Sequence, residues 1–182
     1  MEILCKVKTC TGHYIVRDGK FGVFAGCSEF PKCKSSMKIP ELVENFIKEK
    51  GIKIYCWGKI CWKCSKTTPF ISYFLNYELE ELDSYLGMLG PIGLGDLESV
   101  DRLLEQVIPS IKECYSYTTK STYIANTCEH CGSLQGRNYV VDDPHEIITD
   151  LWHNHDMEKY LYGVLSVEEV GDLSHDLRRI YS

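Results

Sequence analysis

The chain has 182 residues, enough for one ordinary domain or two small ones. Hydrophobic residues make up 44% and charged residues 25%, which are ordinary globular values and exclude a disordered or fibrous chain. No window approaches roughly eighteen uninterrupted apolar residues, so we expect a cytoplasmic protein with no membrane partner.

Charge is distributed unevenly along the chain. Residues 1–40 hold seven Lys or Arg and three acids, a balance of +4, whereas the whole chain is at −6 and the remainder therefore at −10. A basic head on an acidic body indicates nucleic acid as the partner of the head and a different partner for the body. The alternative is that the charges are scattered and solvated.

The N-terminal forty residues are expected to contain a β-hairpin. The sequence alternates around Asp18-Gly19, a dipeptide typical of two-residue hairpin turns, so strands are predicted over 13–17 and 20–25. After Pro40, an amphipathic stretch that ends at Gly51 predicts a short helix. We place a domain boundary here, with one domain over residues 1–40 and a second over residues 41–182.

The second domain is expected to repeat one unit of strand, cysteine pair and strand. Strands are predicted over 52–56 and 68–75 around one pair, and over 121–128 and 134–141 around the other. A mixed tail with a C-terminal helical segment from Pro144 is expected to follow.

An acidic helical insertion, at about 77–109, is predicted between the two cysteine pairs as a helical hairpin broken by residues 90–95. Its acids are Glu78, Glu80, Glu81, Asp83, Asp96, Glu98, Asp101 and Glu105. The insertion is expected either to bind a basic protein partner or to be a solvated helix surface.

Four cysteines of the first domain have the spacing of a metal site. Cys5 and Cys10 precede the predicted hairpin and Cys27 and Cys33 follow it, so two pairs on facing turns can supply the four ligands of a tetrahedral zinc ion. A domain of about forty residues needs such a metal, because its core is too small to stabilise the fold alone. The alternative is a redox or catalytic thiol.

The motif that follows the predicted turn resembles a known family. The C4 zinc fingers at the C-terminus of bacterial type IA DNA topoisomerases have the pattern Gly-x-Phe-Gly-x-Phe-x-Gly-Cys-x-x-Phe/Tyr-Pro-x-Cys. Matching residues are Gly19, Phe21, Gly22, Phe24, Gly26, Cys27, Phe30, Pro31, Cys33 and Lys34. The family usually opens with C-x2-C, whereas this chain has C-x4-C. The resemblance covers residues 1–40 and implies a zinc ribbon that holds single-stranded DNA; nothing downstream resembles the strand-passage machinery.

Independently of that resemblance, the first domain carries rings and cations suited to single strands. Aromatic rings stack on bases, and Lys or Arg side chains meet phosphates. The residues predicted to do so are Tyr14, Arg17, Lys20, Phe21, Phe24, Phe30, Lys32 and Lys34. For Phe21 and Phe24, a place in the small core of the ribbon is an equal alternative.

A second group of cysteines consists of Cys61 with Cys64 and Cys128 with Cys131. Paired C-x2-C turns are typical of zinc sites, although 63 residues separate these two pairs; the alternative is a Cys-x-x-Cys redox pair. Loop closure costs only about 0.6 kcal/mol per doubling of loop length, so the insertion is tolerated. Residues 116–136 are similar to zinc-ribbon regions of uncharacterised bacterial and phage proteins, some of them fused to a topoisomerase-like finger.

Cys56 and Cys114 are left over from these two groups. Both are expected to be small buried hydrophobic residues, and Cys56 competes with Cys61 as an alternative ligand.

We therefore predict an α+β protein with two zinc ions, formed by an N-terminal zinc ribbon and a second zinc-ribbon-based domain with a helical insertion. Its expected function is binding of nucleic acid, namely single-stranded DNA, as an adaptor or accessory factor. One alternative is a metal-dependent nuclease or defence-system component that uses the His/Asp-rich tail around His145 and His153; another is a protein-interaction module with structural zinc. No catalytic residue is assigned.

Overall fold

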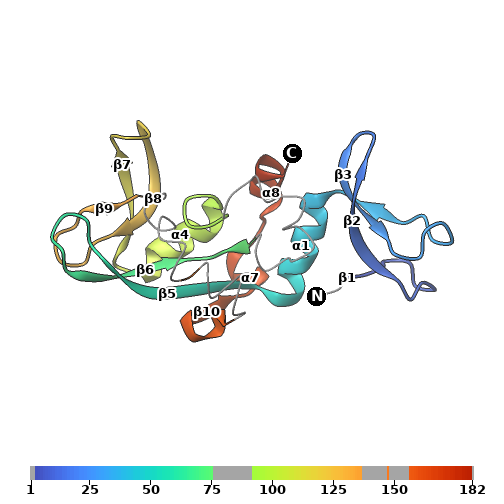
Figure 1. The fold of residues 1–182 in the computed structure, drawn as a ribbon, viewed down its shortest axis with the longest axis horizontal. Helices are drawn as coiled ribbons and strands as arrows, with labels where there is room; N and C mark the ends of the chain where they lie inside the picture. Colours follow the sequence, from blue (N-terminus) through green and yellow to red (C-terminus); the bar gives the residue numbers. More distant parts are fainter. Residues whose placement is uncertain (1–2, 76–91, 137–146, 148–155, 182) are drawn as a thin grey trace.

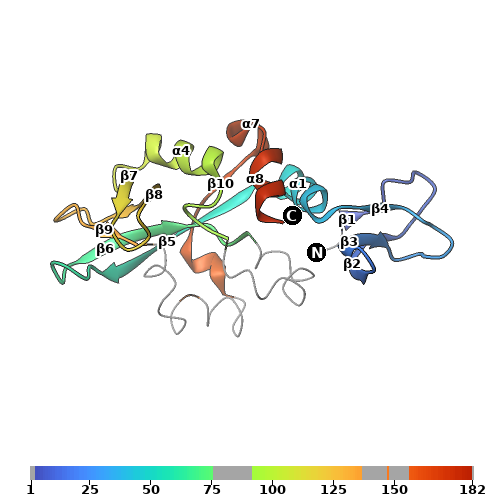
Figure 2. The ribbon, with the colours of Figure 1, turned by 90° about the horizontal axis from the view of Figure 1, so that it is seen from above.

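The computed structural model describes residues 3–75, 92–136, 147 and 156–181, which form an elongated molecule. A small sheet from residues 3–37 lies at one end and a sheet from residues 111–135 at the other (Figures 1 and 2). Helices and another sheet connect the two ends. This arrangement confirms the predicted α+β class with a β-hairpin region at the N-terminus.

The N-terminal sheet is antiparallel and has the strand order β1-β2-β3-β4. Its strands are β1 (Ile3–Leu4), β2 (His13–Gly19), β3 (Gly22–Cys27) and β4 (Ser36–Met37). The predicted hairpin is present as β2 and β3, but its turn is formed by Lys20 and Phe21 and not by Asp18 and Gly19.

The displaced turn follows from the pairing of β2 with β3. Tyr14 pairs with Cys27 and Val16 pairs with Ala25, and all four side chains are buried. A turn two residues earlier would instead pair Val16 with Phe21 and destroy this match of inward faces. Burial of the strand faces therefore overrides the local turn preference.

Helix α1 (Ile39–Lys50) follows the sheet and ends at Gly51, as predicted. Its apolar side is buried at Leu42, Val43, Phe46 and Ile47. These side chains belong to one continuous core that runs from the N-terminal sheet to the far half of the chain. The domain boundary at residue 40 stays a prediction, because buried side chains are continuous across it.

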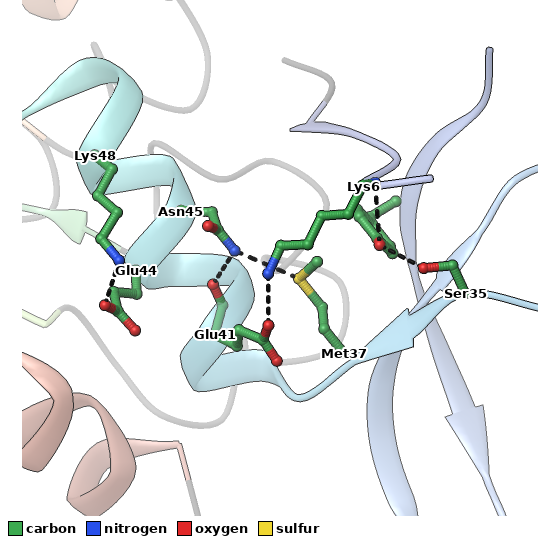
Figure 3. Close-up of polar contacts among 8 residues, drawn as sticks. Lys6, Ser35, Met37, Glu41, Glu44, Asn45 and Lys48 are labelled. Carbon is green, nitrogen blue, oxygen red and sulfur yellow. Dashed lines mark hydrogen bonds and ion pairs between the residues drawn. The ribbon is translucent and has the colours of Figure 1, made fainter. Parts of the chain in front are cut away.

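Polar contacts also join the finger to α1 (Figure 3). Lys6 Nζ lies 2.6 Å from Glu41 Oε1, and Asn45 Nδ2 donates to the Glu41 carbonyl oxygen at 2.7 Å. Asn45 Nδ2 also lies 3.7 Å from Met37 Sδ. The Lys6–Glu41 ion pair is exposed and adds at most about 1 kcal/mol, so the apolar face of α1 supplies most of the stabilisation.

The middle sheet has the order β10-β5-β6 and is antiparallel. It consists of β5 (Ile52–Ile60), β6 (Thr67–Ser72) and β10 (Leu161–Leu165). The loop between β5 and β6 carries Cys61 and Cys64, as expected. The sequence did not predict β10 as a strand; it comes from the far end of the chain and pairs with β5.

The tail continues after η2 (Met157–Tyr160) and β10 into α7 (Val167–Val170) and α8 (Ser174–Ile180). Leu173 and Leu177 of this tail are buried in the continuous core. The helix predicted from Pro144 lies outside the described residues except for Ile147.

The third sheet is antiparallel with the order β7-β8-β9. Its strands are β7 (Ile111–Ser116), β8 (Ser121–Thr127) and β9 (Leu134–Gln135). Helix α4 (Glu98–Val107) precedes it and represents the described part of the predicted insertion; residues 77–91 lie outside the described part. Residues 137–141 of the strand expected over 134–141 also lie outside it. Within the described ranges, no helix is long and apolar enough to cross a membrane.

Candidate metal centres and nucleic-acid interface

The four cysteines of the N-terminal finger converge at one side of its sheet. Cys5 Sγ lies 3.7 Å from Cys33 Sγ, and Cys10 Sγ lies 3.5 Å from Cys27 Sγ. All four sulfur atoms lie within 4.8 Å of one another. Cys5 directly follows strand β1 and Cys27 is the last residue of strand β3; both strands pair with β2, so the sheet itself brings the two cysteine pairs together.

These distances fit a zinc ion and exclude a disulfide. Zinc bonds thiolate sulfur at about 2.3 Å, and the edge of a regular tetrahedron of that size is about 3.8 Å. A disulfide requires about 2.05 Å between the sulfurs. Backbone N–H groups of Gly12 and Glu29 donate to Cys10 Sγ and Cys27 Sγ, both at 3.4 Å. Such bonds stabilise the negative charge that a thiolate ligand carries.

The second group forms an equivalent centre at the other end of the molecule. Cys61 Sγ lies 3.8 Å from Cys131 Sγ, and Cys64 Sγ lies 3.7 Å from Cys128 Sγ. Again the four sulfur atoms lie within 4.8 Å of one another. One pair comes from the β5–β6 loop and the other from the turn between β8 and β9.

The two cysteine turns of this centre share one backbone conformation. Cys61 N–H donates to the Lys66 carbonyl at 2.9 Å, and Ser65 N–H donates back to the Cys61 carbonyl at 3.0 Å. In the other turn Cys128 N–H donates to Ser133 at 2.9 Å, and Gly132 N–H donates to Cys128 at 2.8 Å. The residues at the fourth place after each first cysteine both have positive φ, 57° at position 65 and 67° at position 132.

Contacts other than the metal also align the two turns. Buried Asn126 on β8 donates to the Ile71 carbonyl at 2.8 Å and accepts from Ile71 N–H at 3.0 Å. Trp62 Nε1 donates to the Leu134 carbonyl at 2.7 Å. The hairpins are therefore held in register although 63 residues separate their cysteine pairs.

The pKa values of the cysteine thiols in the second centre indicate that a cation is needed to hold all four sulfur atoms as thiolates. Burial raises the pKa of the Cys61 thiol, but hydrogen bonds from the Ser133 hydroxyl and from the Cys64 and Lys63 N–H groups outweigh it and lower that pKa to about 5. A backbone hydrogen bond from Lys66 lowers the pKa of Cys64, but burial and the neighbouring cysteines together outweigh it and raise that pKa to about 11. All four sulfurs can be thiolates together only around a positive ion. The two groups of four cysteines therefore fit two zinc ions, which confirms the predicted cofactor.

Cys56 and Cys114 belong to neither group. Burial raises the pKa of both thiols, which opposes the thiolate form that a ligand or a nucleophile needs. Cys56 packs against the continuous core and pairs with Ile71 in the middle sheet.

The residues predicted to bind nucleic acid do not all reach the surface. Tyr14 is buried, and its hydroxyl lies 2.6 Å from Ser35 Oγ, so its ring cannot stack on a base. Arg17 and Phe24 are opposite one another on the outward face of the hairpin. The Arg17 guanidinium carbon lies 6.0 Å from the ring centroid of Phe30, whose side chain is 61% exposed.

The hairpin turn and the last cysteine loop add more exposed groups. Phe21, at the turn, is 96% exposed, which excludes the core alternative for this ring. Lys20 Nζ lies 5.6 Å from its centroid. Lys32 and Lys34 are exposed in and after the loop between the last two cysteines. We call the surface formed by Arg17, Lys20, Phe21, Phe24, Phe30, Lys32 and Lys34 the finger face.

Two other expectations are only partly covered by the described residues. In the acidic insertion, Asp96 and Asp101 are buried, and Glu105 pairs with Arg102 at 3.0 Å. The acids between positions 78 and 83 lie outside the described residues. The same holds for His145 and His153, so the hydrolytic alternative for the tail is not supported by any described geometry.

A surface that the sequence reasoning missed lies beside the second metal centre. Trp62 and the tyrosines at 115, 117 and 123 line a groove of about 760 Å³ there. The available signal was the segment 115–123, which consists of tyrosine, serine and threonine residues apart from Lys120.

Comparison with known proteins identifies one segment of the chain. Residues 8–41 match the family described as topoisomerase DNA binding C4 zinc finger. The match covers the hairpin and three of the four cysteines of the first centre, Cys10, Cys27 and Cys33, in agreement with the resemblance noted in the sequence. Curated proteins and solved structures gave no match to the chain.

Proposed function

We propose that the finger face binds single-stranded nucleic acid, DNA in particular, in a zinc-dependent manner, and that the chain acts as an accessory factor rather than as an enzyme. The observation that carries this proposal is the position of cations beside exposed rings on a finger whose family is described as DNA binding. Rings that stack on bases and cations that meet phosphates bind single strands with little sequence preference.

Arg17 is the central cation of this proposal. Its Nη2 donates to the Cys27 carbonyl at 3.3 Å, while its Nε has no hydrogen-bond partner among the described residues. Gly26 leaves room for this side chain, because a Cβ atom there would lie 3.0 Å from Arg17 Cδ. The hydrogen bond to Cys27 holds the guanidinium near the ring of Phe30, so a base stacked on that ring would bring its phosphate close to a positive charge.

Zinc dependence follows from where Phe30 is attached. This ring and Lys32 lie in the short loop between Cys27 and Cys33, which are on opposite edges of the first metal centre. The metal therefore fixes both ends of the loop that presents them. Loss of the ion releases the loop, because a finger of this size has little core of its own.

The proposed role as an adaptor has less support. Two of the acids expected to meet a basic protein are buried, and Glu105 is already paired. Glu98 is exposed at the start of α4 and remains available. A protein partner at the insertion is thus a proposal that depends on Glu98 and on the acids at positions 78–83.

The test is titration of a labelled single-stranded oligonucleotide with the zinc-loaded full chain, by fluorescence anisotropy at several salt concentrations. We expect the double variant Phe30→Ala/Lys32→Gln to weaken binding by at least about fivefold, since one stacked base contributes about 1–3 kcal/mol. The slope of log K against log salt should decrease by about 0.7, the value for one lost phosphate contact on a single strand.

The matched control is Val107→Ala/Lys50→Gln, which removes an exposed apolar side chain and an exposed lysine far from the finger face. It should bind as the unmodified chain does. Equal affinity of the two double variants would reject the assignment of the finger face. Competition by duplex DNA as strong as by the single strand would reject the single-strand preference.

A further inference from the structure

We propose that the second zinc ribbon has its own binding site for single-stranded nucleic acid, in the groove lined by Trp62, Tyr115, Tyr117 and Tyr123, which we call the aromatic groove. This site lies outside residues 8–41 and does not depend on the finger face. The molecule would then bind a strand at each of its two ends (Figures 1 and 2).

The aromatic groove is assembled from both halves of the second ribbon. The turn of the first cysteine pair contributes Trp62 and Lys63. Strand β7 contributes Tyr115, the β7–β8 turn contributes Tyr117, and strand β8 contributes Tyr123. Its volume of about 760 Å³ lies within the range of about 300–1,000 Å³ that is usual for ligand sites. The space can therefore hold more than one base.

Three rings of the aromatic groove, those of Trp62, Tyr115 and Tyr117, are exposed and in contact with a neighbouring group. Tyr117 is 87% exposed and Trp62 59%. The hydrogen bond from Trp62 Nε1 to the Leu134 carbonyl, at 2.7 Å, fixes the indole ring. Tyr115 and Tyr117 meet edge to face with centroids 5.1 Å apart and an angle of 87° between the rings. Exposed rings in fixed positions lose little conformational entropy when a base stacks on them.

Charge favours a polyanion as the occupant. The chain as a whole carries −6, yet none of the described residues that line the groove is acidic and Lys63 is among them. The β5–β6 hairpin and the residues next to it, positions 57–75, contain Lys59, Lys63 and Lys66 and no acid. Lys120 lies in the turn between β7 and β8. Phosphates of a bound strand can therefore meet the ammonium group of Lys63 without facing an acid in the described lining of the groove.

The rest of the lining suits a nucleotide rather than an apolar ligand. Serine and threonine residues line the groove at positions 116, 118, 119, 121 and 133, of which Ser133 is engaged with the sulfur atoms of the metal centre. Hydroxyl groups donate to and accept from base edges, sugars and phosphates. A duplex hides its base faces inside the stack, whereas a single strand offers them to the rings, so the occupant we infer is single-stranded.

The position of Trp62 links the groove to the second metal centre. Trp62 lies between Cys61 and Cys64, and Leu134, which accepts its hydrogen bond, follows Cys131 by three positions. Zinc that joins the two turns therefore also sets the distance between the walls of the groove. Loss of the second ion should open the groove and leave the finger face unchanged.

The experiment uses the zinc-loaded full chain and fluorescein-labelled oligo(dT) of about 12 nucleotides, a length within the site sizes of single-strand binders. Binding is measured for Tyr117→Ala in two backgrounds, the unmodified chain and Phe30→Ala/Lys32→Gln. The control is Ile60→Ala, which removes an exposed side chain from the β5–β6 hairpin next to Trp62 but not from the groove lining. Tyr117 is so exposed that its removal costs little folding free energy.

We expect Phe30→Ala/Lys32→Gln to weaken binding but to keep the part that the aromatic groove supplies. In that background Tyr117→Ala should weaken the remaining binding about fivefold or more, and Ile60→Ala should not. Quenching of the Trp62 emission, taken as the difference between the unmodified chain and Trp62→Phe, should follow the same titration. If Tyr117→Ala equals Ile60→Ala in both backgrounds, as it would for a groove that holds a peptide, the inference is wrong and the finger face is unaffected. If the finger variant binds normally and Tyr117→Ala abolishes binding, the finger face is wrong and the groove stands.

Discussion

A buried carboxyl group beneath the second ribbon gives a sharp prediction about pH. Asp101 of α4 accepts a hydrogen bond from the Tyr73 hydroxyl at 3.0 Å and another from Gly95 N–H at 3.0 Å. Burial raises the pKa of Asp101 to about 8, and the nearby Asp96 and Asp176 add to the effect. The same carboxyl group in the unfolded chain has a pKa of about 3.9.

The sign and size of the effect follow from these two values. Between pH 4 and pH 8 the folded chain holds a proton on Asp101 that the unfolded chain has lost, so the free energy of unfolding falls as pH rises. The stabilisation that comes from the protonated Asp101 is fully present below about pH 4 and is lost as pH rises through about 8. From pH 6 to pH 8 the free energy of unfolding should decrease by about 2 kcal/mol.

The assay is urea denaturation followed by circular dichroism at pH 6 and pH 8, with zinc saturating at both. Asp101→Asn is the matched variant, because it cannot ionise and is close to the protonated acid in shape. The difference between the two chains cancels the pH dependence of zinc binding. If the free energy of unfolding changed between pH 6 and pH 8 by the same amount in the unmodified chain and in Asp101→Asn, the reasoning would be refuted.

Three other predictions concern the frame of the two centres. Asn126→Ala should lower the free energy of unfolding by at least about 2 kcal/mol in urea titrations, since it leaves Ile71 N–H and C=O buried and unpaired; a cost under 1 kcal/mol would contradict this. Gly51→Ala should lower the melting temperature more than Gly132→Ala does. Both glycines have positive φ, but a Cβ atom at position 51 would lie 2.5 Å from the Leu165 carbonyl oxygen, whereas a Cβ atom at position 132 would meet nothing within 4 Å. The reverse order in thermal melts would count against a close contact between Gly51 and β10. Acidification below about pH 5 should release zinc to a colorimetric chelator, because protons compete for thiolates; full retention of zinc at pH 3 would be inconsistent with thiolate ligands.

Residue spacing along the chain was sufficient to predict the metal ligands and the first helix. The cysteine spacing indicated both metal centres, and the amphipathic run after Pro40 indicated α1 with its end at Gly51. Ring and cation positions on the finger were indicated by residue type, although only the structure shows that Phe21 is exposed and Tyr14 is buried.

Features that depend on distant partners were not predictable from the same reasoning. The hairpin turn moved by two residues because burial of Tyr14 and Val16 fixed the register, and no local signal reports that burial. Strand β10 is a strand only because β5 lies beside it, more than a hundred positions earlier in the chain. The aromatic groove likewise joins Trp62 to tyrosines more than fifty residues away, so its parts are visible in the sequence and their convergence is not.

The most direct test of the account is the zinc content of the full chain, by native mass spectrometry and elemental analysis of the same preparation. The two groups of four cysteines predict two zinc ions per chain, one for Cys27→Ser and one for Cys128→Ser, with the ion lost from a different end in each variant. The account would be contradicted if the chain folded with no bound zinc, or if both single variants kept two zinc ions.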